Sequence, residues 1–242
     1  MKSLIFAISL LLTATAYGQY QGDDVYDPFA DYSEFEENSQ EEADVHFFRN
    51  GRFFNAALMM GGRMFTADTQ DYFEANMSPG LYLAYFFNLR FAVQFSYTFS
   101  EHAYQIPAGT NNSGAPYPGI NGNVSFSAMA FDLKYYFNTQ NVTRGLADLN
   151  PFILFGFSQN YRTFSVDDQT QVAKDDAAGF DFGAGIEIPI ARNQMYVGAQ
   201  FVYTYVNFPI ENRNVTAPDQ TLTDKFLSGD VMSAHLILGI NF

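Results

Sequence analysis

The chain has 242 residues, no cysteine and a formal net charge of −14. The lack of cysteine excludes disulfides, thiolate metal sites and a cysteine nucleophile. The negative charge excludes nucleic acid as a partner, because nucleic-acid binding needs a basic surface. Aromatic residues make up 18% of the chain, which suits strands that alternate apolar and polar side chains better than a water-exposed surface.

Residues 1–18 are predicted to be a signal peptide. Lys2 supplies the positive charge, residues 4–12 are an apolar run, and Ala16 and Gly18 are the small residues of a cleavage site. We therefore expect export and cleavage after Gly18. An uncleaved membrane anchor is the alternative, but the run is shorter than the ~20 residues that a spanning helix needs.

Residues 19–52 form an acidic segment, in which positions 20–48 hold ten acidic residues and no Lys or Arg. Such a block of charge predicts a solvated, disordered segment. Ser33 and Glu36 could form a capping box, so a short helix over 34–43 stays open. Interleaved aromatic residues, such as Tyr26 and Phe29, provide apolar surface for a partner to cover.

From residue 53 onward the hydrophobic period is two, which predicts a barrel over 53–242. We expect eight strands, at 54–65, 80–87, 90–99, 124–137, 151–163, 179–190, 195–207 and 231–242. Segments of about ten alternating residues separated by turns are typical of an antiparallel transmembrane up-and-down β-barrel. The fold class is therefore all-β.

Alternation assigns the faces of each strand. In 90–99 the first face carries Phe91, Val93, Phe95, Tyr97 and Phe99, and the second carries Ala92, Gln94, Ser96 and Thr98. A soluble sandwich would also alternate, with its apolar face inward. The export signal, the strand lengths and the abundance of Phe and Tyr on the apolar face together favour a membrane barrel.

Connections between the predicted strands alternate in length. Those at 66–79, 100–123, 164–178 and 208–230 are long, that at 138–150 is moderate, and those at 87–90 and 191–194 are tight. Barrels of this kind have short periplasmic turns and longer extracellular loops. Both termini, and with them the acidic segment, are therefore expected in the periplasm.

These features resemble the small bacterial outer-membrane β-barrel superfamily, which includes OmpX-like barrels and the transmembrane domain of OmpA. The resemblance covers about residues 53–242 and includes a closing strand that ends Leu238-Gly239-Ile240-Asn241-Phe242. It implies a place in the outer membrane of a Gram-negative bacterium, in contact with lipid and lipopolysaccharide. It also implies that Phe242 is an assembly signal for the barrel-assembly machinery.

Charged residues on the inward face are predicted to form a polar network in the lumen. Its members are Arg63, Lys134 and Arg162, which oppose Asp132, Asp181 and Glu187, together with His235. Unpaired charges would be costly there, so we expect pairing and a formally neutral plug. A narrow ion path is the alternative, whereas a wide diffusion pore would need about 16 strands.

Two weaker patterns are compatible with a catalytic site and a metal site. Ser233, His235 and Glu187 could form an acyl-transfer set, as in lipid A deacylase barrels, but here they point into the lumen. His102 is expected near a loop and His46 in the acidic segment. Acidic residues in the third long loop could bind a divalent cation, although a solvated loop is favoured; they are Asp167, Asp168, Asp175 and Asp176.

The sequence thus favours a non-enzymatic structural and interaction protein without a cofactor or a metal site. Its extracellular loops would contact external partners, and its acidic segment would dock on a periplasmic protein. The alternatives are a small gated channel or porin-like pore, and a lipid hydrolase.

Overall fold

The computed structural model describes residues 53–137, 149–166, 172–190, 194–208, 214–216, 222–226 and 229–242. The predicted signal peptide, the acidic segment and His46 lie outside these residues. No helix in the described ranges is long and apolar enough to cross a membrane.

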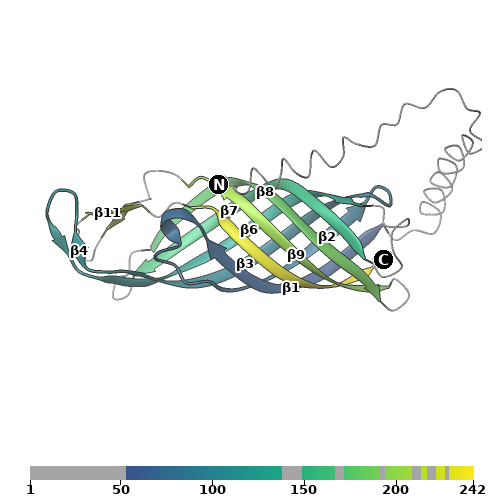
Figure 1. Ribbon diagram of the computed structural model, residues 1–242, viewed down its shortest axis with the longest axis horizontal. Helices are drawn as coiled ribbons and strands as arrows, with labels where there is room; N and C mark the ends of the chain where they lie inside the picture. Colours follow the sequence, from purple (N-terminus) through teal and green to yellow (C-terminus); the bar gives the residue numbers. More distant parts are fainter. Residues whose placement is uncertain are drawn as a thin grey trace, which may run out of the picture. The chain divides into compact units, whose positions relative to one another are not determined.

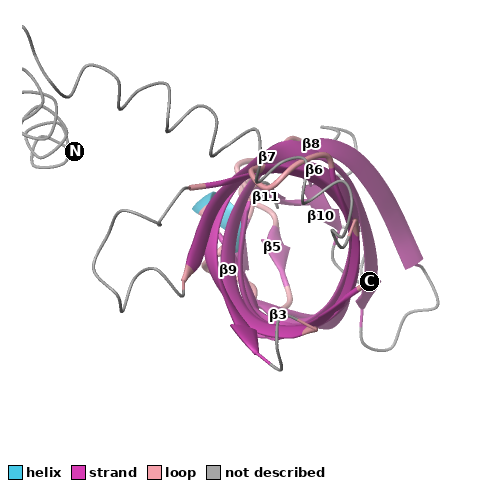
Figure 2. Cartoon of the chain, turned by 90° about the vertical axis from the view of Figure 1, so that its right-hand side faces the viewer, coloured by secondary structure: helices cyan, strands magenta, loops and turns pink. Residues whose placement is uncertain are grey.

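Eight antiparallel strands close into a barrel in the order β1-β12-β9-β8-β7-β6-β3-β2. Figure 2, which looks along the barrel, shows the closed ring of strands. The wall strands are β1 (Phe54–Phe65), β2 (Asn76–Phe86), β3 (Phe91–Ile106), β6 (Ile120–Tyr136), β7 (Asn150–Val166), β8 (Val172–Ile190), β9 (Met195–Val206) and β12 (Val231–Asn241). The predicted fold class and number of wall strands are therefore confirmed.

The barrel closes between its first and last strands. β1 pairs with β12 from Asn55 opposite Asn241 to Phe65 opposite Val231. At the end of this seam the Phe242 amide donates to the Phe54 carbonyl at 2.7 Å. We call the end with Phe54 and Phe242 the terminal end, and the opposite end, with the long connections, the loop end.

Several predicted strand bounds are wrong at the loop end. β2, β3, β6 and β8 extend into segments that were expected to be loops, β3 as far as Ile106 and β8 back to Val172. The physical reason is that outward residues there are polar, as Glu101 and Gln105 are on β3, while inward residues remain buried. The alternation of burial continues after the apolar outer face has ended.

That change on the outer face marks the membrane-spanning part of the wall. On β3 the outward Phe91, Phe95 and Phe99 are exposed and apolar, and Glu101 follows. Outward residues on β12, from Met232 to Phe242, are apolar throughout. Nine to eleven residues of each such strand match the length that a tilted strand needs to cross a bilayer.

Small elements occupy the loop end. A 3-10 helix, η1 (Ala67–Thr69), follows β1, and two short hairpins follow β3 and β9. The hairpins are β4 (Gly109–Thr110) with β5 (Pro116–Tyr117), and β10 (Asn214–Thr216) with β11 (Leu222–Phe226). Figure 1 shows β4 and β11 beyond the barrel end that lies opposite the C-terminus.

Inside the wall, aromatic rings pack over glycines on the neighbouring strand. A Cβ at Gly239 would lie 2.0 Å from the ring of Tyr196, its register partner, and one at Gly185 would lie 2.4 Å from the ring of Phe152. Each glycine thus leaves room for a large inward ring. These pairs let eight strands enclose an interior filled by side chains.

Candidate functional site: the closed lumen

The predicted lumen residues are all buried inside the barrel, where they lie at three levels along its axis. Glu187 and Lys134 lie toward the terminal end, Asp132, Asp181, Arg63 and His235 line a central cavity, and Arg162 lies toward the loop end. The levels differ in how well their charges are paired, so we describe each in turn.

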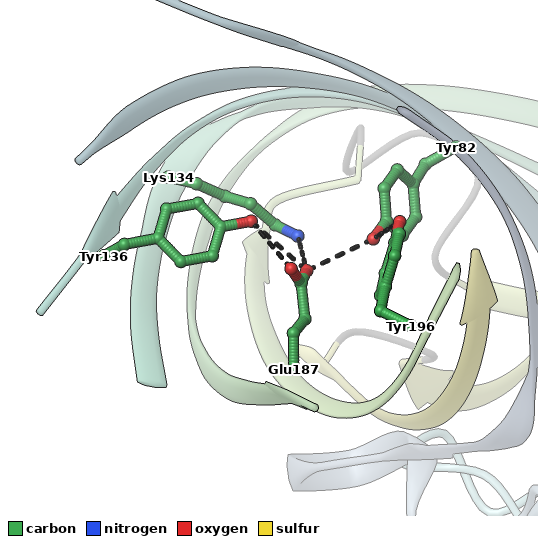
Figure 3. A network of polar contacts seen from close by, with 5 residues as sticks. All are labelled: Tyr82, Lys134, Tyr136, Glu187 and Tyr196. Atoms are coloured by element: carbon green, nitrogen blue, oxygen red, sulfur yellow. Dashed lines mark hydrogen bonds and ion pairs between the residues drawn. The ribbon is translucent and has the colours of Figure 1, made fainter. Parts of the chain in front are cut away.

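Glu187 is the centre of the cluster nearest the terminal end (Figure 3). The Lys134 ammonium lies 2.9 Å from Glu187 Oε1, and the Tyr136 hydroxyl donates to both carboxylate oxygens, at 3.2 and 3.1 Å. The Tyr82 hydroxyl donates to Oε1 at 3.3 Å and lies 2.5 Å from the Tyr196 hydroxyl. This carboxylate therefore accepts hydrogen bonds from three different side chains.

Aromatic rings complete the same cluster. The Lys134 ammonium lies 4.1 Å from the ring centroid of Phe152 and 4.6 Å from that of Tyr82. Cation–π contacts of this kind are strongest when water is excluded. The cluster thus surrounds one buried ion pair with aromatic rings.

The central level contains a cavity of about 40 Å³. Arg63 donates to Thr98 at 2.5 Å and to Ser100 at 2.9 Å rather than to a carboxylate. Asp181 Oδ1 accepts hydrogen bonds from Ser158 at 3.1 Å and Thr204 at 2.5 Å. Asp132 Oδ1 and Asp181 Oδ2 make no hydrogen bond, although both side chains are buried.

Arg162 and Asp175 form the paired level nearest the loop end. These register partners on β7 and β8 lie 2.8 Å apart, with side chains no more than 1% exposed. The guanidinium also stacks on Phe208 and Phe164, with ring centroids at 4.0 and 4.6 Å. Burial and stacking together make this ion pair a fixed part of the interior.

His102 links the lumen to the connection between β1 and β2. Its Nδ1 lies 2.8 Å from the Glu74 carbonyl, which can only accept, so Nδ1 carries the proton. Its Nε2 lies 2.9 Å from the Ser100 hydroxyl, whose oxygen accepts from Arg63. Burial lowers the pKa of His102, and the positive charge of Arg63 lowers it further, despite the hydrogen bond to Glu74.

An apolar cluster closes the lumen at the loop end. The rings of Phe65 and Phe126 lie 4.7 Å apart, and the His102 ring packs against both. The buried members are Phe65, Phe73, Tyr104, Ile106, Tyr117, Ile120, Val124, Phe126, Phe164, Ala177, Val206, Phe208 and Val231. The loop end of the lumen is therefore filled by packed rings and aliphatic side chains around the Arg162–Asp175 ion pair.

Three expectations about charge need correction. Asp175, expected in a solvated loop, lies in β8 and is the partner of Arg162. Asp176 also lies in β8, while Asp167 and Asp168 fall outside the described residues. The buried interior is not formally neutral, since three bases face four acids among the described residues once Asp175 is included: Arg63, Lys134 and Arg162 against Asp132, Asp175, Asp181 and Glu187.

Sequence reasoning also missed residues that the lumen depends on. His102 was expected near a loop, yet it is buried within β3. Tyr82, Tyr136 and Tyr196 hold Glu187, and their signal in the sequence was their inward position in the alternation. The alternation predicts apolar residues on the outer, lipid-facing side, so aromatic rings on the inward face were not predicted as lumen residues.

The proposed catalytic set is not assembled. Ser233 and His235 are both buried in the lumen, and no hydrogen bond joins them. Nucleophilic catalysis needs a base within hydrogen-bond reach of the nucleophile. In the ranges that the structure describes, no group of three His, Cys, Asp or Glu residues could hold a metal ion.

Comparisons with known proteins place this geometry in context. The family model described as "Outer membrane protein beta-barrel domain" matches residues 59–228. No curated protein sequence matches the chain. Similar solved structures are the N-terminal β-barrel domain of Pseudomonas aeruginosa OprF (16% identity, 78% of this chain and 97% of that chain, TM-score 0.42) and Neisserial surface protein A (12%, 78% and 97%, 0.48).

Proposed function

Because the chain belongs to the family of outer-membrane β-barrel proteins, we propose that it is a non-conducting barrel that acts as a structural and interaction protein. The barrel anchors the chain in the Gram-negative outer membrane. Its loop end faces the cell exterior, in contact with lipopolysaccharide, and both termini face the periplasm. The proposed function includes no enzymatic activity.

One observation carries the proposal, namely that the lumen is filled at both ends. Glu187, Lys134 and three tyrosines occupy the terminal end, and the buried aromatic cluster around Phe65 and Phe126 occupies the loop end. A continuous aqueous path would need water where these rings pack. Eight-stranded barrels enclose only enough space for side chains to fill.

The orientation rests on the connections. The described tight turn at residues 87–90 lies at the terminal end, while the elements η1, β4, β5, β10 and β11 belong to the longer connections of the loop end. Outer-membrane barrels place their short turns in the periplasm and their longer loops outside. Exposed loops of this size are the part of the protein best suited to external partners.

Planar-bilayer recordings of the full mature chain test the proposal. We expect no conductance steps from the native protein. A variant with Phe65, Phe126, Tyr82 and Tyr136 all replaced by Ala removes rings from both closures and should conduct. The matched control replaces outward rings instead, Phe95→Ala and Phe131→Ala, and should stay silent. Ohmic conductance from the native protein would contradict the proposal.

A small gated channel is the second candidate. The observation that favours it is the central cavity, which is lined by Arg63, Asp132 and Asp181 between the two closures. Voltage-dependent opening of the native protein, lost in an Arg63→Met variant that still folds, would favour this function. The lipid hydrolase has no comparable support, and labelled lipid A should not be deacylated.

The acidic segment is the part proposed to contact the periplasm. Residues 20–48 combine ten acidic residues with interleaved aromatic residues, which together suit a segment that orders on a basic or amphipathic periplasmic protein. Removing residues 20–48 should leave insertion of the barrel unchanged and abolish co-purification of that partner. If the set of co-purified proteins is the same after the deletion, the segment is a spacer.

A further inference from the structure

Two buried carboxylates in the central cavity have no ion-pair partner in the described part of the chain. Asp132 and Asp181 are each 2% exposed, and each keeps one oxygen without a hydrogen bond. The two ion pairs that the described residues form, Lys134–Glu187 and Arg162–Asp175, lie at the other two levels. We propose that the cavity binds a monovalent metal cation between Asp132 and Asp181.

The strand register brings the two carboxylates to the same level. Asp132 on β6 lies opposite Gly156 on β7, and Gly156 lies opposite Asp181 on β8. No side chain separates the two acids, and a Cβ at Gly156 would lie 2.4 Å from Asp132 Oδ1. The Asp132 carboxylate therefore leans across the glycine toward the strand that carries Asp181.

Neutral groups extend this row on both sides. Gln94 is the register partner of Asp132, and Thr204 is that of Asp181. Gln94 is fully buried, and neither its amide oxygen nor its amide nitrogen makes a hydrogen bond. Gln200, 6% exposed in the cavity wall, also has an amide oxygen without a partner. The Gln200 oxygen, which lines the cavity with the two carboxylates, points to a bound species that the chain itself does not supply.

The charge of the interior calls for one more positive charge, and the proposal commits to a cation rather than a proton on one carboxylate. Three buried bases against four buried acids leave one negative charge without a counterion among the described residues. Water could satisfy the hydrogen bonds of the cavity but not its charge. A positive charge on His235 would have to face Arg63 across the same cavity, which disfavours it.

The donor set favours a monovalent metal ion. Carboxylate and amide oxygens are hard ligands, which suit alkali and alkaline-earth cations. One missing positive charge matches a monovalent ion, and no group of three acidic or histidine ligands exists in the described ranges for a more highly charged one. The cavity of about 40 Å³ has room for such an ion with a water molecule, at the ≳10–15 Å³ that each water needs.

Unfolding of the full mature chain in detergent tests the proposal. At equal ionic strength, about 150 mM sodium or potassium chloride should slow unfolding about tenfold relative to N-methylglucamine chloride. This is the shift expected when the ion is at about ten times its Kd. Asp132→Asn should remove the difference, and so should Asp181→Asn. Glu101→Gln, which neutralises an exposed acid on the outer face of β3, should keep it.

Crystals of the native protein grown with rubidium chloride give a second readout. Anomalous scattering should show one rubidium ion between the carboxylates of Asp132 and Asp181. Unfolding that is identical in all three salts, or an equal salt effect in Asp132→Asn and the native chain, would overturn the proposal. So would unfolding that depends on pH but not on the cation, since a proton would then balance the charge.

Discussion

Arg162 and Asp175 show what a buried charge contributes at the scale of a single residue. Both side chains are essentially inaccessible to water, and they lie 2.8 Å apart. Forming such a pair adds little net stability, because both ions lose their hydration. Removing one partner is strongly destabilising, because the charge of the other then stays buried without its ion-pair partner.

Replacing Arg162 by Met should therefore destabilise the barrel by about 3–5 kcal/mol. Urea unfolding in detergent, followed by the gel shift between folded and unfolded forms, measures the change. The double variant Arg162→Met with Asp175→Asn should recover much of the loss, because both charges of this pair are removed together. Equal destabilisation in the single and double variants would contradict this account.

His102 gives the loop end a dependence on pH. Its pKa in the folded protein is lowered from the ordinary value of 6.5, so the folded state disfavours protonation. Its contribution to stability is therefore present above about pH 6.5 and is lost as the pH falls below that value. Lowering the pH from about 7 to 5 should destabilise the loop end, because a protonated His102 ring would be buried beside the positive charge of Arg63.

Hydrogen exchange of the Glu74 amide, which donates to the Ala103 carbonyl at 3.2 Å, reports on the stability of this part of the barrel. Exchange at acidic pH, corrected for the intrinsic rate, should rise in the native protein and change less in His102→Gln. An equal rise in both proteins would show that titratable groups other than His102 cause the effect.

At the scale of the strand, inward aromatic rings depend on glycines across the ladder. A methyl group at Gly239 would lie 2.0 Å from the Tyr196 ring and would force it aside. Tyr196 would then lose its hydroxyl contact with Tyr82 in the Glu187 cluster. Gly239→Ala should destabilise the barrel by about 1–3 kcal/mol, the usual cost of overpacking.

Gly62→Ala is the matched control for this change. A Cβ at Gly62 would come no closer than 3.8 Å to any neighbouring atom. Urea unfolding of this variant should match that of the native protein. A similar loss in both variants would point to backbone flexibility rather than to ring packing.

Phe242 closes the seam between the first and last strands. Its amide hydrogen-bonds to Phe54, but its side chain is 65% exposed and packs little within the chain. We predict that deleting Phe242 strongly lowers the yield of barrel in the outer membrane, because the assembly machinery no longer recognises the strand. The same protein should refold from urea into detergent normally. Normal insertion in cells would contradict the assembly role.

At the scale of the whole molecule, closure of the sheet leaves no strand edge along the membrane-spanning wall. Each wall strand pairs on both sides, from β1 with β12 and β2 around to β9 with β8. A closed barrel satisfies its backbone hydrogen bonds internally, which is required where lipid replaces water. The unboiled protein should therefore resist SDS and migrate differently from the boiled protein on a gel. Identical migration of both samples would count against closure.

The sequence by itself determined the class of fold and the two faces of the wall. Alternating residues such as Phe91 and Ala92 must point to opposite sides of a strand, so local pattern was sufficient to predict eight strands and an apolar outer face. Strand ends at the loop end were not predictable in this way. Beyond the membrane the pattern is inverted on β3, where outward residues such as Glu101 are polar and inward ones such as Ile106 are apolar, so the apolar outer face no longer marks the strand.

Only the tertiary structure decided which charges pair. Lys134 and Glu187 are 53 residues apart, and Arg162 takes a partner that sequence reasoning had placed in a loop. Pairing inside a barrel depends on register and stagger, which bring distant strands to one level along the axis. For the same reason Asp132 and Asp181 could be predicted to face inward, but their meeting across Gly156 follows only from the register of three neighbouring strands.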